Sequence, residues 1–153
     1  MKKYAIDTCS LINAAKNYNP TKAFFAPLWK EITDMIAAGT LISSVEVRDE
    51  VKDEDLVKWC KQNDGLFLPL TEEIQRKTII ILRDFPTMIK MKSTGNSNAD
   101  PFLIATAILE NAIVVSDEQP GDESSGNYKL PNVCRKYGIE CITLRDFLDT
   151  ILE

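Results

Sequence analysis

The chain of 153 residues contains no histidine. This absence excludes Ser-His-Asp and Cys-His catalysis, zinc sites with imidazole ligands, and acid–base chemistry by imidazole. Any chemistry must therefore use carboxylates, hydroxyls, lysine or cysteine. Basic residues are also in the minority, with 18 Lys and Arg against 23 Asp and Glu and a net charge of -5. That balance argues against tight polyanion binding by counterion release, but not against a metal ion that bridges carboxylates and phosphate.

Long apolar runs are lacking as well, since none approaches the roughly 18 residues of a membrane span. The opening Met1-Lys2-Lys3 precedes only a short apolar run, which does not resemble a signal peptide. The four cysteines form no C-x-x-C pair, so we expect reduced, buried thiols, with Cys134 and Cys141 the one pair that could join. We expect a cytoplasmic protein with no membrane partner. The chain length predicts one domain over residues 1–153.

Short apolar segments alternate with helical patterns along the chain. Strands are expected at 4–6, 40–42, 66–68, 113–115 and 141–142. Helices are expected at 9–16, 22–38, 54–62, 71–85, 100–111, 131–137 and 144–152, and a short one begins at Ser43 or Ser44, where Ser43-x-x-Glu46 has the spacing of a capping box. Loops are expected at 87–99 and 116–129. This order predicts an α/β fold, in three α/β/α layers around a central, mainly parallel sheet.

Acidic residues follow the expected strands in four separate segments: Asp7, then Glu46 and Glu50, then Asp100, then Asp117 and Glu118. Ligands of parallel sheets bind beyond the carboxyl ends of strands, so we expect these acids to converge. Two carboxylates about 4 Å apart repel by about 4 kcal/mol at an effective dielectric constant of 20, and such a site needs a cation. Oxygen ligands select Mg²⁺ or Mn²⁺, which support phosphodiester hydrolysis without histidine.

Each acid also has an ordinary structural interpretation. Asp100 could cap a helix, Glu46 fits the capping box, and the pair at 117–118 could open a turn. Asp7 is the hardest to explain in this way, because an ionised group after a buried strand is costly unless it is paired or coordinated. Thr8 and Ser10 could orient metal-bound water or phosphate, or simply cap the following helix.

Four segments carry a resemblance to a known family. Residues 4–12 form an apolar strand followed by Asp and Thr, and residues 42–51 end in Glu plus an apolar residue. Residues 98–107 place an Asp at the start of an alanine-rich helix, and residues 114–118 run from apolar residues to Ser, any residue and an acid. In this order they resemble the motifs of the PIN-domain superfamily of metal-dependent ribonucleases, which includes small toxins of toxin–antitoxin pairs. The fourth acid of that family is usually Asp, and here Glu118 holds its place.

The resemblance implies a PIN-like endoribonuclease that hydrolyses RNA with Mg²⁺ or Mn²⁺. The ligands that it implies are Asp7, Glu50 and Asp100 for the principal ion, then Glu118, with Asp117 as its substitute and Glu46 as a further ligand or a cap. Residues expected to position substrate are Thr8, Ser10, Ser116, Lys92 and Lys129, with Lys90, Arg135 and Lys136 as further guides for RNA. An antitoxin protein and a homodimer are the implied partners. A catalytically silent PIN-like binding scaffold and a DNA-directed nuclease remain the alternatives.

Overall fold

The computed structural model describes residues 1–89 and 98–153. Within them, five strands form one sheet in the order β3-β2-β1-β4-β5, and every neighbouring pair is parallel. The strands are β1 (Lys3–Ile6), β2 (Leu41–Ser44), β3 (Phe67–Leu68), β4 (Ala112–Val115) and β5 (Cys141–Ile142). The predicted α/β fold with a parallel central sheet is confirmed.

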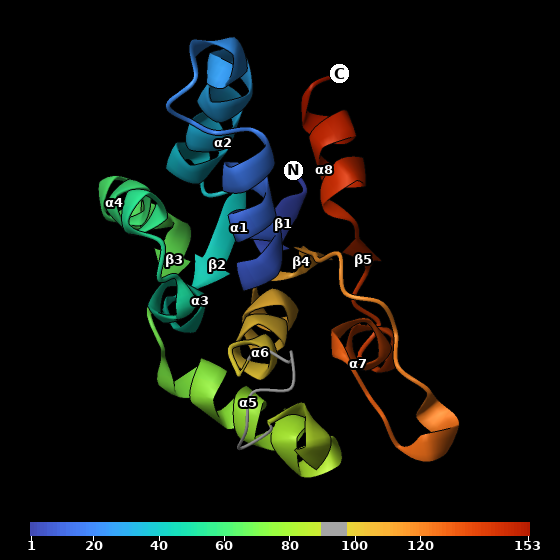
Figure 1. Cartoon of the computed structure of the whole chain (residues 1–153). Helices are drawn as coiled ribbons and strands as arrows, with labels where there is room; N and C mark the ends of the chain where they lie inside the picture. The colour runs from blue at the N-terminus through green and yellow to red at the C-terminus, as the bar shows by residue number, and fades with distance from the viewer. Residues whose placement is uncertain (90–97) are drawn as a thin grey trace.

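Helices separate the strands along the chain. They are α1 (Thr8–Asn17), α2 (Ala26–Ala38), α3 (Val45–Glu50), α4 (Glu54–Gln62), α5 (Glu72–Asp84), α6 (Asp100–Glu110), α7 (Leu130–Lys136) and α8 (Leu144–Ile151). Single 3₁₀ turns occur at Ala23–Phe25, Asp64–Leu66, Pro86–Met88 and Glu123–Ser125. In Figure 1, α5, α6 and α7 lie below the sheet, and α2 and α8 lie above it. No helix in the described part of the chain is long and apolar enough to span a membrane.

Helix α6 is the central helix below the sheet, because it is apolar around most of its circumference. Leu103, Ile104 and Ala105 are fully buried, and the helix packs on β1, β2 and β4 while α5 covers its outer side. On the other face, the Phe147 ring of α8 packs on the Tyr4 ring of β1, with centroids 5.1 Å apart. Helices therefore cover both faces of the sheet, which gives the three layers that the sequence predicts.

The strand order changes direction at β1. The chain builds outward from β1 through β2 to β3, and then crosses to the other side of β1 for β4 and β5. Ile6 and Val115 are partners in the register of β1 and β4, so residues 7 and 116 leave the sheet side by side. Ligands of open α/β sheets bind in the crevice at such a point of reversal, beyond the carboxyl ends of the strands.

Of the two predicted caps of the short third helix, Ser44 is confirmed and Ser43 is wrong. Strand β2 extends through Ser44, and Ser43 lies inside it and donates its hydroxyl to the Ile6 carbonyl oxygen at 2.7 Å. Ser44 is instead the N-cap of α3, where its hydroxyl accepts from the Val47 backbone N–H. The capping box that spacing predicted between Ser43 and Glu46 is therefore absent, because strand pairing fixes where the helix begins.

Helix α6 begins where it was predicted, but its N-cap differs. Asp100 is the first residue of the helix, and Ala99 occupies the N-cap position without a side-chain cap. The interpretation of Asp100 as an ordinary helix cap is therefore wrong. The expected loop at 116–129 contains the 3₁₀ turn at Glu123–Ser125, and the expected helix at 22–38 begins with the turn at Ala23–Phe25.

Candidate metal centre

Asp7 directly follows β1 and is 4% exposed. Its Oδ1 accepts the backbone N–H of Ser10 at 2.8 Å, so the side chain caps α1. Burial raises the pKa of the Asp7 carboxyl, hydrogen bonds with Ser116 and Ser10 lower it, and the charge of Asp117 raises it. Burial is the largest of these effects. The fold therefore holds a carboxyl group in a place where ionisation is costly.

Glu50, at the last position of α3, connects two other elements of the site. Its Oε1 accepts the Thr8 hydroxyl at 2.7 Å, and its Oε2 accepts the Ala99 backbone N–H at 3.3 Å. Thr8 opens α1, and Ala99 precedes Asp100, which is 5% exposed at the start of α6. Glu50 thus links the first residues of α1 to the first residues of α6.

The charges of acids from four segments act on the thiol of Cys9. Burial is the largest cause that raises the pKa of this thiol to about 11, and the next causes are the charges of Asp7, Asp100, Glu118 and Glu50. These acids come from the ends of β1, α3 and β4 and from the start of α6, and Glu50 accepts hydrogen bonds from the residues next to Asp7 and Asp100. The four acids remain candidate ligands. Cys9 itself is exposed, contrary to the expectation of a buried thiol.

Glu118 lies three residues after the end of β4. Burial raises the pKa of its carboxyl most strongly, the charge of Lys129 lowers it, and the charge of Asp7 raises it. Hydrogen bonds with the Leu130 backbone and with the Asp100 side chain lower it further. The charges of Lys129 and Asp7 and the Asp100 side chain thus all act on the Glu118 carboxyl.

Other predicted residues have different surroundings. Oδ1 of Asp117 accepts the Leu144 backbone N–H at 2.9 Å, so this side chain holds the start of α8. Burial raises the pKa of Glu46, and the charges that act on it are those of Asp49 and Arg48. Ser116 Oγ accepts the Glu118 backbone N–H at 3.1 Å, and its expected role in positioning substrate stays a prediction. The predicted Lys90 and Lys92 lie outside the described residues.

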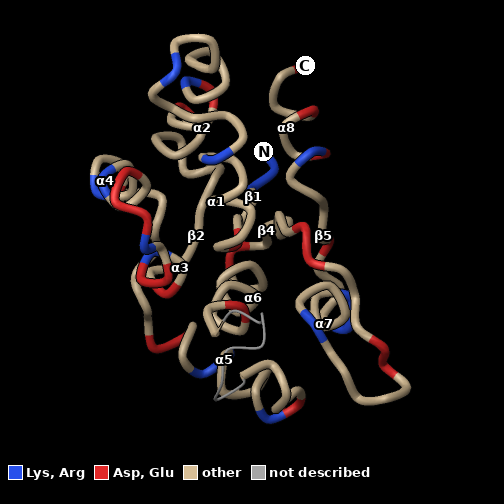
Figure 2. Tube along the Cα trace, viewed as in Figure 1, with Lys and Arg blue, Asp and Glu red and all other residues tan. Residues whose placement is uncertain are grey.

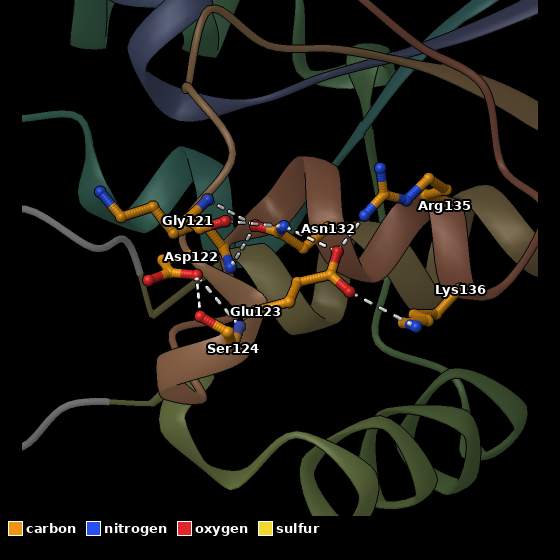
Figure 3. A network of polar contacts seen from close by, with 8 residues as sticks. Gly121, Asp122, Glu123, Ser124, Asn132, Arg135 and Lys136 are labelled. Carbon is orange, nitrogen blue, oxygen red and sulfur yellow. Dashed lines mark hydrogen bonds and ion pairs between the residues drawn. The ribbon is translucent and has the colours of Figure 1, made fainter.

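The segment between Glu118 and Lys129 is held by a network that sequence reasoning missed (Figure 3). Asn132 Oδ1 accepts the backbone N–H groups of Gly121 and Lys129 at 2.6 and 3.0 Å, and its Nδ2 donates to the Gly121 carbonyl oxygen. Glu123 accepts from Asn132 and Arg135 and pairs with Lys136. Arg135 and Lys136, expected as RNA guides, therefore anchor this loop. Asn132 is the third residue of α7, and nothing in the sequence pattern indicated that its side chain contacts Gly121, eleven residues earlier.

A family model described as a domain of unknown function, DUF4411, matches residues 4–151. The chain belongs to the DUF4411 family. No curated protein matches it. The four candidate ligands, together with Cys9 and Lys129, all lie within the part of the chain that this DUF4411 match covers.

The donor set of this DUF4411 protein fits a hard divalent cation in its chemistry. Asp7 is buried, and in the part of the chain that the structure describes no Lys or Arg forms an ion pair with it. The Ser10 hydroxyl beside it is fully buried and has no hydrogen bond of acceptable geometry with any described residue. Within residues 1–89 and 98–153, no three Asp, Glu or Cys side chains lie close enough together to form a group that could hold a metal ion.

Proposed function

We propose that this DUF4411 protein is a PIN-like endoribonuclease that uses Mg²⁺ or Mn²⁺ to hydrolyse RNA phosphodiester bonds. One observation carries the proposal: the Glu50 carboxylate accepts from Thr8 and from Ala99, so the residues that follow Asp7 and precede Asp100 meet at one acid. These acids lie at the reversal point of the sheet, where ligands of α/β folds bind. A set of oxygen donors without histidine is typical of Mg²⁺ and Mn²⁺ sites.

Asp7 and Asp100 are the two most buried acids in the described part of the chain. Asp100 is not a helix cap, because Ala99 occupies that position. Asp7 does cap α1, but an Asn would serve as well there without the cost of burying a charge. Buried groups with perturbed pKa values that meet in one place are typical of functional sites.

Asp7, Glu50, Asp100 and Glu118 would hold the ion. When bound, such an ion would neutralise charge on the phosphodiester and lower the pKa of a water molecule. The chain's own hydrogen bonds keep the ligands in place, since Thr8 holds one oxygen of Glu50 and the Ser10 N–H holds Oδ1 of Asp7.

Lys129 has a separate role in this proposal. Its charge lowers the pKa of Glu118, so it favours the ionised form of that ligand. It also places a cation at the edge of an acidic site, where an RNA phosphate must approach. The protein inhibitor and the homodimer implied by the family resemblance remain predictions, and the proposed chemistry requires neither.

The test is cleavage of a mixed RNA substrate by purified protein with Mn²⁺ and with EDTA. We expect cleavage only with Mn²⁺, and a loss of at least about 100-fold in the Asp100→Asn and Glu50→Gln variants, because loss of a ligand exceeds the 10- to 100-fold effect of supporting residues. Glu46→Gln is the matched control, because it changes an acid on the same helix as Glu50 and should cleave like the wild type.

Two results would contradict the proposal. Cleavage that persists in EDTA, or that is equal in Asp100→Asn and the wild type, would show a contaminating nuclease or another site. Absence of cleavage in all samples, in protein that Mn²⁺ does not stabilise, would favour a binding scaffold, and cleavage of DNA alone would favour the DNA-directed nuclease.

A further inference from the structure

Two cysteines outside the proposed ligand set, Cys134 and Cys141, lie on neighbouring elements. Cys134 is in α7 and Cys141 is the first residue of β5, and the two elements pack on each other. Between them the chain reverses direction. Gly138 takes the left-handed conformation with a φ of 70°, and the Ile139 N–H donates to the Cys134 carbonyl oxygen at 2.8 Å. The turn therefore holds the start of β5 beside the last turn of α7.

The side chains of the two cysteines meet between these elements. Cys134 belongs to the apolar core, and Cys141 packs against that core. Their thiol groups form a hydrogen bond with each other, and both thiols are free. A disulfide needs two cysteines whose backbones are close and whose side chains point toward each other. Two thiols that already contact each other can therefore join without a large movement of the backbone.

The two thiols differ in how a reagent from solvent reaches them. Cys134 is fully buried, whereas Cys141 is half-buried on β5, which is the last strand in the order of the sheet. The hydrogen bond with Cys134 is the largest cause that lowers the pKa of the Cys141 thiol below its ordinary value of 9.0. The same hydrogen bond, followed by burial, raises the pKa of the Cys134 thiol. Because the thiolate is the nucleophile in disulfide exchange, Cys141 is the thiol that reacts first.

We propose that Cys141 and Cys134 form a site of reversible oxidation that takes small-molecule disulfides. The Cys141 thiolate attacks one sulfur of such a disulfide, the S–S bond of the small molecule breaks, and one small thiolate leaves with the electron pair. Cys134 then passes its proton to solvent and attacks the Cys141 sulfur, which releases the second small thiolate. Two protein thiols are oxidised to a disulfide between α7 and β5, and the small disulfide is reduced to two thiols.

The test treats folded, reduced protein with oxidised glutathione, blocks the remaining thiols, and digests the product with trypsin in the absence of reductant. Arg135 and Lys136 lie between the two cysteines in the sequence, so trypsin separates the two cysteine peptides unless a disulfide joins them. We expect peptides 130–135 and 137–145 to be joined in the oxidised wild type. Dithiothreitol should separate them again.

Three variants test the order of the two steps. Cys134→Ser should stop at a mixed disulfide of glutathione on Cys141, because no second thiol attacks it. Cys141→Ser should leave Cys134 unmodified, because Cys134 is fully buried. Cys9→Ser is the matched control, because it removes the exposed thiol, and it should give the joined peptides as the wild type does.

Absence of the joined peptides in the oxidised wild type would overturn the proposal. Joined peptides that link Cys134 or Cys141 to Cys9 or Cys60 instead would overturn it as well. Glutathione on Cys134 in Cys141→Ser, formed as fast as the wild type is oxidised, would contradict Cys141 as the first thiol to react. These outcomes do not depend on Mn²⁺ binding or RNA cleavage, so failure of the proposed function would leave them unchanged.

Discussion

Two polar clusters of this molecule lie on either side of the segment that follows β4. They differ in whether donors face acceptors and opposite charges face each other. Around Asn132, amide groups meet backbone donors and acceptors, and Glu123 meets Arg135 and Lys136 (Figure 3). Asp7 and Glu118 follow the ends of β1 and β4. Burial is the largest of the effects that raise the pKa of each carboxyl group, and the charge of another acid raises it further. Figure 2 shows basic segments on α7 and acidic segments near the ends of the strands.

The difference distinguishes a structural cluster from a candidate site. Matched hydrogen bonds stabilise one arrangement of the backbone, so the Asn132 network is complete without any ligand. Crowded carboxyl groups lower stability unless a cation or protons neutralise them. We therefore expect variants of the first cluster to lose stability, and variants of the second to lose ion binding with little loss of stability.

The largest change in stability should follow Asn132→Ala. The backbone N–H groups of Gly121 and Lys129 would lose their acceptor in a buried region, which should lower the free energy of unfolding by about 2 to 4 kcal/mol, since each unsatisfied group costs about 1 to 3 kcal/mol. Urea unfolding monitored by circular dichroism measures the change. Ser124→Ala, on the exposed part of the same loop, is the control and should cost less than about 0.5 kcal/mol. Equal stability of both variants and the wild type would contradict a stabilising role of the Asn132 network.

Asp117 and Glu118 are adjacent acids that should behave in opposite ways. Asp117→Ala removes the acceptor of the Leu144 N–H at the start of α8 and should cost about 1 kcal/mol of stability while Mn²⁺ binding remains. Glu118→Gln should leave stability unchanged or raised, because it removes a carboxyl that burial disfavours, but it should weaken Mn²⁺ binding. Thermal unfolding with and without Mn²⁺ distinguishes the two, and the reverse pattern would assign the ligand to Asp117.

These two acids also show where sequence reasoning reached its limit. The order of the motifs correctly indicated that acidic residues follow β1 and β4. Strands, helices and their order along the chain can be recognised from local sequence patterns. The spacing of the motif could not tell which of Asp117 and Glu118 is the better candidate ligand. Asp117 accepts from Leu144, and Leu130 and Lys129 act on Glu118, and only the folded chain brings these residues near.

The same limit explains the errors at helix starts. Ser43 and Ser44 are equally good caps by sequence. In the folded chain the Ser43 hydroxyl donates to the Ile6 carbonyl oxygen, whereas the Ser44 hydroxyl accepts from the Val47 N–H and caps the helix. Helix α4 begins and ends where it was predicted, because Asp53 caps it and its apolar face is regular. The strand order was not predicted, although it is the feature that brings the ends of β1 and β4 together.

A smaller effect is expected from Asp7→Asn, and its sign depends on pH. Burial raises the pKa of Asp7 above its ordinary value of 3.8 in the folded state. The folded protein thus binds this proton more tightly than the unfolded chain, and stability falls as pH rises between the two pKa values. In EDTA, Asp7→Asn should raise the melting temperature at neutral pH, and the gain should vanish as pH falls below 3.8. A lower melting temperature for the variant at pH 7 would mean that other groups of the folded protein already offset the cost of burying the Asp7 charge.

The smallest effect should follow Lys129→Ala. If this lysine meets an RNA phosphate, its loss should reduce the slope of log affinity against log salt by about 1. Binding to single-stranded RNA in EDTA, measured by fluorescence anisotropy at several salt concentrations, tests this. Lys136→Ala is the control, because Lys136 already pairs with Glu123. An identical slope for Lys129→Ala and the wild type would exclude a phosphate contact at this position.

The most direct test of the account is Mn²⁺ binding by the wild-type protein and by Asp100→Asn, measured by calorimetry and by the shift in unfolding. If the four acids form a metal centre, Mn²⁺ at 100 times its dissociation constant should stabilise the wild type by about 2.7 kcal/mol, and Asp100→Asn should lose most of this gain. Equal stabilisation of both proteins, or none in the wild type, would contradict a metal centre at the ends of β1 and β4.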